Sequence, residues 1–282
     1  MRIVHKVSDL HTELSDWRAG LESVALVPTM GNLHAGHASL VKRARQLGEC
    51  VVVSIFVNPL QFGPHEDFER YPRTLAADAK LLEAEHADVV FAPAVADMYP
   101  AGYPPLTSVH VGGTVAETLE GDFRPGHFTG VATVVNILFN LVQPRVAIFG
   151  EKDWQQLQVI RRMVADLGMP VRIVGMPTLR EADGLAMSSR NQYLQPDERA
   201  RAPLLHAALQ AVATATAEGR RDFDVLCAEQ KAVLENAGFR PQYLEVREPD
   251  LTPPREDSAR LVVLAAAHLG ATRLIDNVSL RL

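Results

Sequence analysis

Two histidines stand at the start of a predicted helix in the segment TMGNLHAGHASLVKRARQLG (29–48). The segment follows an apolar run, contains Gly31 and Gly36 for tight turns, and places His34 and His37 three residues apart. The N–H groups of a helix N-terminus attract phosphate, and two imidazoles can donate hydrogen bonds to charge that develops on a phosphoryl group. The alternative is a glycine-containing turn with two surface histidines. A zinc site is disfavoured, because it needs histidines at i, i+4 with a nearby acid.

Two further polar segments could take part in the same chemistry. Lys152 and Asp153 follow the apolar run VAIFG (146–150), where a lysine can meet phosphate and an acid can hold a ribose hydroxyl. The alternative is a solvated pair in which Asp153 caps a helix. The segment MSSR (187–190) offers two serine hydroxyls and the guanidinium of Arg190 to a triphosphate, or is a polar surface loop. Gly184 would let this segment move as a lid.

Short apolar runs are the elements that must position these residues. They alternate with helical patterns along the first 176 residues: VALVP (24–28), VVVSIFV (51–57), VVFAP (89–93), VAIFG (146–150) and VRIVG (171–175). Runs that are apolar on both faces are typical of parallel strands covered by helices on each side. The sequence therefore predicts an α/β fold with a Rossmann-like, doubly wound parallel sheet, whose ligands bind at the carboxyl ends of the strands.

Two helices are predicted beyond residue 177, after a polar loop. The first follows Pro196 and Asp197 and carries apolar residues on one face, namely Leu205, Leu209 and Val212. The second follows Asp222 and ends at Gly238. We expect it to bury one stripe, formed by Val225, Leu226, Ala232 and Val233.

Three strand candidates close the chain: YLEVRE, ARLVVLAAAHL and TRLIDNVSL. With the two helices they predict a smaller C-terminal α+β domain whose strands pair antiparallel. The expected domains are residues 1–176 and 177–282, with a cleft between them that the loop 177–194 lines.

The composition excludes several classes of protein. The 282 residues are enough for about two domains of roughly 150 residues, and 47% hydrophobic and 22% charged residues indicate a globular chain. A net charge of −6 argues against a general nucleic-acid-binding protein. Cys50 and Cys227 lack zinc-type spacing and fit a reducing compartment. Since we find no signal sequence, and LVVLAAAHLGA (261–271) is too short to span a bilayer, we expect a cytoplasmic protein without membrane contact.

The histidine segment also carries a family resemblance. HAGH resembles the HIGH motif of the nucleotidylyltransferase superfamily, which includes the class I aminoacyl-tRNA synthetases, and PTMGNLHAGHASL resembles the corresponding segment of the pantothenate synthetase family. Four further segments resemble that family in its order and approximate spacing: SIFVNPLQFGPHEDFERYPRT (54–74), GDFRPGHFTGVATVV (121–135), FGEKDWQQL (149–157) and MSSRNQYL (187–194). Five segments in order are far more specific than one tetrad.

The resemblance implies an ATP-dependent ligase of pantothenate biosynthesis, on the route to coenzyme A. In that family ATP and pantoate form pantoyl adenylate and pyrophosphate, and β-alanine then attacks the acyl carbon to give pantothenate and AMP. It implies four catalytic residues: His37, a proton donor by the family's convention, with His34, Lys152 and Arg190. The implied ATP-binding residues are Met30, Gly31, Asn32, Leu33, His34, Ala35, Gly36, His37, Gly150, Glu151, Lys152, Asp153, Leu179, Met187, Ser188, Ser189 and Arg190.

Two glutamines match the pantoate-binding residues of the family, Gln61 in NPLQFG and Gln156 in EKDWQQL. Pantoate carries a carboxylate, two hydroxyls and a gem-dimethyl group, so its site needs uncharged hydrogen-bonding groups in an apolar wall. Candidates for the wall are Met30, Phe62, Val134 and Val135, and further candidates for the site are Asn58, Tyr71, Arg124 and His127. The alternatives are an exposed helix position for Gln156 and a turn residue for Gln61.

Magnesium is expected with ATP, but we assign no metal ligand, since this ion keeps waters and binds phosphate oxygens. Asp78 is a conceivable outer ligand, and a solvent-facing helix acid is the favoured interpretation.

Family membership suggests a homodimer. The alternative functions are a nucleotidylyltransferase that transfers AMP to a phosphorylated acceptor and a catalytically silent nucleotide-binding protein. The short length and acidic balance disfavour a tRNA synthetase.

Overall fold

The computed structural model describes the chain from Met1 to Leu282 except Leu21, His65 and Leu106. The chain forms two compact units. The first comprises residues 1–112, 124–151 and 156–177, and the second comprises 113–123, 152–155 and 178–282.

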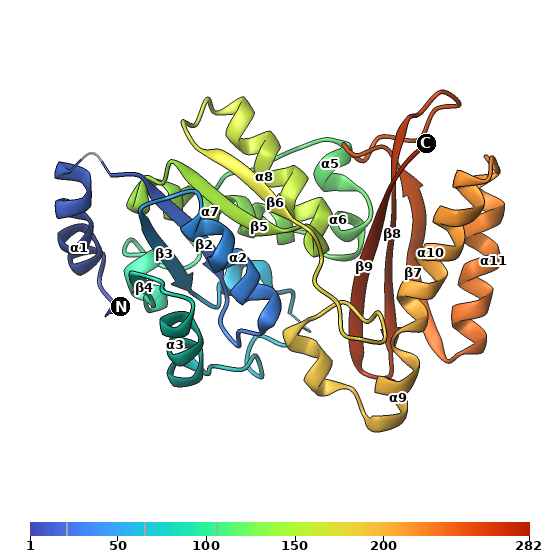
Figure 1. Cartoon of the computed structure of the whole chain (residues 1–282), viewed down its shortest axis with the longest axis horizontal. Helices are drawn as coiled ribbons and strands as arrows, with labels where there is room; N and C mark the ends of the chain where they lie inside the picture. The colour runs from blue at the N-terminus through green and yellow to red at the C-terminus, as the bar shows by residue number, and fades with distance from the viewer. Residues whose placement is uncertain (21, 65, 106) are drawn as a thin grey trace. The chain divides into compact units, whose positions relative to one another are not determined.

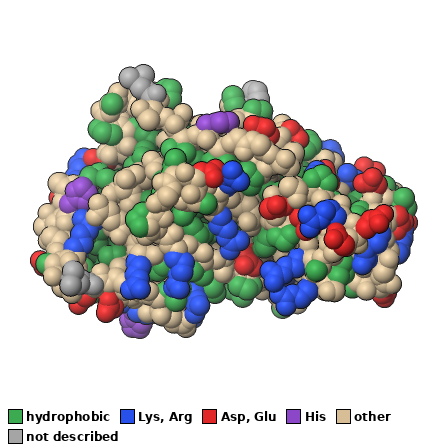
Figure 2. Space-filling view, turned by 90° about the horizontal axis from the view of Figure 1, so that it is seen from above, with side chains coloured by type: hydrophobic (Ala, Val, Ile, Leu, Met, Phe, Trp, Pro, Cys, Tyr) green, Lys and Arg blue, Asp and Glu red, His purple; other side chains and the backbone are tan. Residues whose placement is uncertain are grey.

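Within the described residues, no helix has the length and apolar character needed to cross a membrane. Basic and acidic side chains lie close together in several places on the face that Figure 2 shows, and surface ion pairs such as Arg162–Asp166 occur at helical i, i+4 spacing.

A six-stranded, all-parallel sheet forms the centre of the first unit (Figure 1). Its order is β1 (Arg2–Val4), β4 (Val89–Phe91), β3 (Cys50–Ile55), β2 (Val24–Thr29), β5 (Val146–Gly150) and β6 (Arg172–Met176). The predicted doubly wound α/β fold is thereby confirmed. The three-residue β1 was not predicted, because it is a short edge strand with two exposed residues.

Helices cover both faces of this sheet. Ala25 and Val27 of β2 share a core with Leu40 and Val41 of α2, whereas Leu26 points to the opposite face by strand alternation. Helix α7 packs against β2 and α1. The helices assigned wholly or mainly to this unit are α1 (Val7–Ala19), α2 (Ala35–Arg45), η1 (Pro59–Gln61), α3 (Leu75–Ala84), α4 (Val95–Met98), α7 (His127–Val142) and α8 (Trp154–Asp166).

The second unit contains an antiparallel sheet of β7 (Phe239–Arg247), β8 (Arg260–Leu269) and β9 (Thr272–Arg281). This agrees with the predicted smaller α+β fold. Its helices are α5 (Thr114–Glu117), α6 (Glu120–Phe123), η3 (Ser189–Tyr193), α9 (Pro196–Arg201), α10 (Leu204–Ala217) and α11 (Phe223–Asn236), and η2 (Glu151–Asp153) lies mostly in it. The predicted helix after Pro196 is thus two helices, with Ala202 and Pro203 between them.

Strand β8 is apolar on both faces because both faces are covered. Its odd-numbered residues, such as Val263 and Ala265, share a core with α10 and α11. Its even-numbered residues, such as Val262 and Leu264, pack with Leu119 and Trp154. The segments 113–123 and 152–155 therefore belong to this unit, although the expected boundary after residue 176 places them in the first domain.

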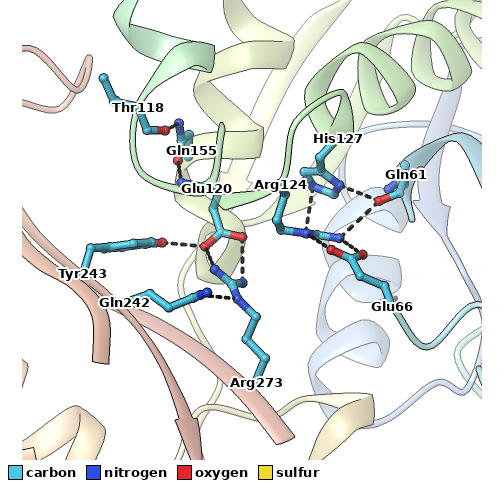
Figure 3. A network of polar contacts seen from close by, with 10 residues as sticks. All are labelled: Gln61, Glu66, Thr118, Glu120, Arg124, His127, Gln155, Gln242, Tyr243 and Arg273. Atoms are coloured by element: carbon cyan, nitrogen blue, oxygen red, sulfur yellow. Dashed lines mark hydrogen bonds and ion pairs between the residues drawn. The ribbon is translucent and has the colours of Figure 1, made fainter. Parts of the chain in front are cut away.

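A buried carboxylate secures the segment 113–123 (Figure 3). Glu120 is 6% exposed and accepts two hydrogen bonds from Arg273, at 2.8 and 2.6 Å, and one from the Tyr243 hydroxyl at 2.7 Å. The Gln155 side chain accepts from the Glu120 N–H and donates to the carbonyls of Val115 and Thr118. Burial and the nearby Glu120 charge raise the pKa of Tyr243 well above its ordinary value, so this phenol remains a donor.

The predicted stripe of α11 is wrong for three of its four members. Leu226 is buried, whereas Val225 and Val233 are 51% and 49% exposed and Ala232 is exposed. The buried side chains are Leu226, Cys227 and Leu234. They recur at i, i+1 and i+8, so the buried face is turned by about one residue from the expected one. Gly238, with a φ of +87°, ends the helix as predicted.

Helix α7 approaches η1 very closely in the first unit. A Cβ atom added to Gly130 would lie 2.5 Å from the carbonyl carbon of Leu60 and closer still to its oxygen. His127, Gly130 and Val134 are spaced i, i+3 and i+7 and share this face of the helix. Because Gly130 has no side chain, α7 can lie this close to the turn that ends at Gln61.

Replacing Gly130 by alanine is expected to lower the free energy of unfolding by about 3 kcal/mol, because the methyl group meets rigid backbone. Urea denaturation measures this change. Gly20→Ala is the matched control, since a Cβ there meets its nearest atoms at 3.5 Å and the backbone is right-handed helical. We expect a change within about 0.5 kcal/mol for the control. Equal stabilities of the two variants would contradict the close approach.

Candidate active site

The histidine segment begins α2 with reciprocal capping hydrogen bonds. The His34 ring accepts a hydrogen bond at Nδ1 from the N–H of Gly36, at 3.1 Å, and the His37 ring accepts one at Nδ1 from the N–H of His34, at 3.3 Å. The two ring centroids are 4.2 Å apart. The helix N-terminus and the imidazoles therefore form one compact group, as the phosphate interpretation requires.

These bonds select the tautomer of both rings. A nitrogen that accepts from a backbone N–H carries no proton, so each neutral imidazole holds its proton on Nε2. His34 and His37 therefore both present an Nε2–H donor. Two neutral donors at a helix N-terminus are suited to an anionic, oxygen-rich ligand.

Asp78 holds the loop before α2 in place. Its carboxylate accepts from the N–H groups of Asn32 and Leu33, at 3.0 and 2.8 Å, and from the hydroxyl of Thr74. Asp78 is 2% exposed, so the expected solvent-facing acid is wrong: the carboxylate is buried because it binds these donors. Gly31 has a φ of +82°, and a Cβ there would lie 3.1 Å from Asp78 Oδ2.

A mostly apolar cavity of about 280 Å³ lies beside this loop. Met30, Gly31 and Asp78 line it together with residues that follow β3 and β4, such as Phe56 and Ala94. Met30 thus lies at an apolar surface, and its role as a wall of the substrate site stays a prediction. In the described part of the chain, no three His, Cys, Asp or Glu residues gather in a way that could hold a metal ion.

Gln61 is fixed at the end of η1, after β3. Its carbonyl accepts hydrogen bonds from His127 Nδ1 at 2.8 Å and from Arg124 at 3.1 Å (Figure 3). The opposite nitrogen of His127 lies 3.1 Å from Arg124, which can only donate, so the ring is neutral with its proton on Nδ1. Arg124 and His127, named above as further candidates for the site, therefore support the turn that carries Gln61.

Arg124 also binds Glu66 with two parallel hydrogen bonds of 2.7 and 2.6 Å. Burial raises the pKa of Glu66, but the hydrogen bonds and charge of Arg124 outweigh this effect and hold the pKa below its ordinary value of 4.5. The carboxylate stays ionised at neutral pH. Arg124 thus connects three segments of the first unit: the loop at 66, the turn at 61 and the start of α7.

The two adjacent glutamines of α8 have different environments. Gln155 is 3% exposed, and its amide is used to hold residues 115–120, as described above. Gln156 is partly exposed. Of these two glutamines, only Gln156 has an accessible side chain, and its role in binding pantoate stays a prediction.

Asp276 and Asn277 anchor two predicted site segments within the second unit. The Asn277 side chain donates to the carbonyl of Lys152 at 2.8 Å. Arg180 donates to the Asp276 carboxylate at 2.6 and 2.9 Å and to the Asn277 carbonyl at 3.1 Å. These two residues were missed from the sequence. The signal was present, since two adjacent polar residues interrupt the apolar strand TRLIDNVSL.

The loop before MSSR folds back on itself. Arg180 pairs with Ala186 as an isolated antiparallel bridge, and the N–H of Met187 donates to the carbonyl of Leu179 at 3.0 Å. Leu179 and Met187, two residues of the ATP-binding prediction that lie eight positions apart in the sequence, are therefore neighbours. Ser188 caps η3 by accepting from the N–H of Arg190 at 3.2 Å.

The structure thus groups the predicted residues in two sets. The first unit contains Met30, Gly31, Asn32, Leu33, His34, Ala35, Gly36, His37, Gln61, Gly150, Glu151 and Gln156, and the second contains Lys152, Asp153, Leu179, Met187, Ser188, Ser189 and Arg190. Within the first set, residues follow β2, β3 and β5, which are neighbours in the sheet. The carboxyl edge of these strands therefore gathers both histidines, Gln61 and Gly150.

Comparison with known proteins decides the family. The family model for pantoate-beta-alanine ligase matches residues 2–279. The chain belongs to this family. A member of the family from Pseudomonas paraeruginosa, named pantothenate synthetase, is 53% identical over 283 residues that cover 100% of both chains. The resemblance seen in five sequence segments is confirmed.

Two solved structures of the ligase family extend the agreement to the fold. The enzyme from Thermus thermophilus is 49% identical, with a TM-score of 0.90 over 99% of both chains. The enzyme from Francisella tularensis, in a complex with beta-gamma ATP and beta-alanine, is 33% identical, with a TM-score of 0.82 over 99% of this chain and 97% of that one. The fold described above is therefore the fold of the ligase family.

Asp78→Asn is expected to lower the free energy of unfolding by about 2–3 kcal/mol, because an amide NH₂ would face a backbone N–H where the carboxylate now accepts. Thermal and urea denaturation measure the loss. Glu83→Gln, an exposed position on the same helix, is the control and is expected to change stability by less than about 0.5 kcal/mol. If Asp78→Asn is as stable as the control, the carboxylate does not hold the loop.

Proposed function

We propose that this chain condenses pantoate with β-alanine to form pantothenate, with ATP cleaved to AMP and pyrophosphate. Membership of the pantoate-beta-alanine ligase family over residues 2–279 is the observation that carries the proposal. The histidine pair at the start of α2 supports an ATP-dependent first step. The complex of the Francisella tularensis relative with beta-gamma ATP and beta-alanine supports the choice of substrates.

The first step is attack of the pantoate carboxylate on the α-phosphorus of ATP. The bond from carboxylate oxygen to phosphorus forms, the bond to the bridging oxygen breaks, and pyrophosphate leaves with the electron pair. Such in-line transfer requires positioning and charge stabilisation rather than a protein nucleophile. His34 and His37 donate from Nε2 to phosphate oxygens as charge develops, and Lys152 and Arg190 add positive charge.

The second step is attack of the β-alanine amine on the acyl carbon of pantoyl adenylate. The amide bond forms, AMP leaves with the bonding electrons, and the amine loses a proton. Exclusion of water protects the adenylate from hydrolysis. Gln61 and Gln156 supply hydrogen bonds to the pantoyl group, and Met30, Phe62 and Val134 supply apolar surface for its methyl groups.

The remaining ATP contacts follow the family pattern: the backbone around Gly31 and Gly150, the Asp153 carboxylate for the ribose, and Leu179 with Met187–Arg190 for the rest of the nucleotide. Magnesium accompanies ATP as the counter-ion of its phosphates. Asp78 is a poor ligand for it, because its oxygens already accept from Asn32, Leu33 and Thr74. From the family resemblance we also propose a cytoplasmic homodimer.

Labelled pyrophosphate is expected to exchange into ATP only when pantoate is present, with magnesium supplied and β-alanine left out. This reaction isolates the first step, because it needs the adenylate but not the amine. Formation of pantothenate is then expected only after β-alanine is added. Exchange that proceeds equally without pantoate, or ATP binding without any exchange, would refute the proposed substrate.

Two substitutions of His37 separate its structural and chemical roles. In His37→Asn the side-chain oxygen replaces Nδ1 and keeps the acceptor for the His34 N–H, but the Nε2 donor is lost. His37→Gln places an NH₂ donor near the position of Nε2 and loses the cap. We expect His37→Asn to reduce exchange about 100-fold or more with an unchanged melting temperature, and His37→Gln to retain more exchange than His37→Asn. The reverse order of exchange rates would assign His37 to capping alone.

A further inference from the structure

Asn58 is the buried centre of a hydrogen-bond chain in the first unit. The residue is fully buried at the N-cap of η1. Its Oδ1 accepts from the Tyr99 hydroxyl at 2.6 Å and from the N–H of Leu60 at 3.3 Å. Its Nδ2 donates to the carbonyl of Gly130 at 3.1 Å and to Gln61 Oε1 at 3.0 Å. All four hydrogen-bonding positions of this amide are therefore used.

The donors and acceptors around Asn58 fix which way its amide faces. Two donors, from Tyr99 and Leu60, meet the oxygen, and two acceptors, from Gly130 and Gln61, meet the nitrogen. A flipped amide would place NH₂ against an N–H and an oxygen against two oxygens. The N–H of Leu60 can only donate and the carbonyl of Gly130 can only accept, so these two groups set the orientation, and the Tyr99 hydroxyl stabilises it with the shortest of the four bonds.

The orientation of Asn58 is passed on to Gln61. Because Gln61 Oε1 accepts from Asn58, the NH₂ group of the same amide is directed away from Asn58. Among the residues that the structure describes, none accepts a hydrogen bond from Gln61 Nε2, and Gln61 is partly exposed. The side chain therefore presents a donor, and not an acceptor, to a ligand.

The surroundings of Tyr99 keep its hydroxyl protonated. It is 4% exposed, lies edge-on to Phe56 with ring centroids 6.1 Å apart, and has Tyr103 at a similar distance. Burial, with a smaller effect of Tyr103, raises the pKa of Tyr99 well above its ordinary value of 10.0. The hydroxyl therefore keeps its proton at neutral pH.

We propose that Tyr99 is a positioning residue which, through Asn58, holds the Gln61 amide with its NH₂ group toward pantoate, so that the site selects a substrate oxygen that accepts a hydrogen bond. This rests on the proposed function, because Gln61 is taken as a pantoate-binding residue. Tyr99 touches no reacting atom. Its contribution is indirect. It keeps the Gln61 NH₂ group facing the substrate oxygen, where a turned amide would instead place its own oxygen against that acceptor.

Tyr99→Phe removes the hydroxyl and keeps the ring. Pantoate-dependent pyrophosphate exchange should then show a KM for pantoate raised about fivefold, the loss that one hydrogen bond causes, with the KM for ATP unchanged within twofold. Tyr103→Phe is the matched control, because Tyr103 is 51% exposed and its hydroxyl has no hydrogen bond to Asn58. We expect the control to leave both KM values unchanged.

A double-mutant cycle with Gln61→Ala tests whether Tyr99 acts through Gln61. Tyr99→Phe should have no further effect on the pantoate KM when Gln61 is alanine. Equal effects in both backgrounds, equal changes in the KM for ATP, or no effect of Tyr99→Phe in the native background would each overturn the inference. If Gln61→Ala itself leaves the pantoate KM unchanged, the proposed pantoate site fails, and the inference fails with it.

Gln61→Glu gives a second measurement in a variant that keeps the tyrosine. The carboxylate can still accept from Asn58, but it turns an oxygen toward the substrate in place of NH₂. The pantoate KM should rise more in Gln61→Glu than in Gln61→Ala, because an acceptor faces an acceptor. A smaller effect of glutamate than of alanine would contradict the assigned polarity of the amide. Melting temperatures of all variants separate these effects from loss of the fold.

Discussion

The carboxylate of Asp78 binds two consecutive backbone N–H groups, at Asn32 and Leu33, and the geometry of the histidine pair follows from that contact. The loop must turn sharply between β2 and α2, which requires positive φ angles at Gly31 and Asn32. A loop in this conformation exposes N–H groups that need an acceptor. Because Asp78 supplies it, the next residues can begin α2 with the two rings capping its N-terminus.

Polar side chains also hold separate segments together elsewhere in each unit. Asn58 joins η1 to α7, and Arg124 joins the same turn to the loop at Glu66. In the second unit, Glu120 with Arg273 and Tyr243 fastens the segment 113–123 to the sheet. Asn58, Glu120 and Tyr243 are buried, and Arg124, Glu66 and Arg273 are partly buried. Each has its partners present, so its desolvation is compensated and its geometry is specific. The candidate site residues are thus supported by side chains that do not themselves meet a ligand.

The sequence predicted the strands β2, β3 and β5 well, because they are covered on both faces and are therefore almost entirely apolar. It failed where a feature depends on distant contacts. The exposure of Val225 and Val233 depends on how α11 is turned against the sheet, and the burial of Asp78 depends on the loop that it binds. The five family segments located the histidines and Gln61 directly. Asn58 and Arg124 could be named as candidates, but their partners Tyr99 and Glu66 could not, since these lie about 40 and 60 residues away along the chain.

The assignment of 113–123 and 152–155 to the second unit has a consequence for how the chain can be divided. The backbone passes from one unit to the other after residues 112, 123, 151, 155 and 177, so no single cut yields two complete units. A fragment that starts at residue 178 would lack Leu119 and Trp154 and would expose the even-numbered face of β8 to water. Such a fragment would self-associate through that apolar face. The two units are therefore interleaved along the sequence. Each contains segments that lie, in the sequence, between segments of the other.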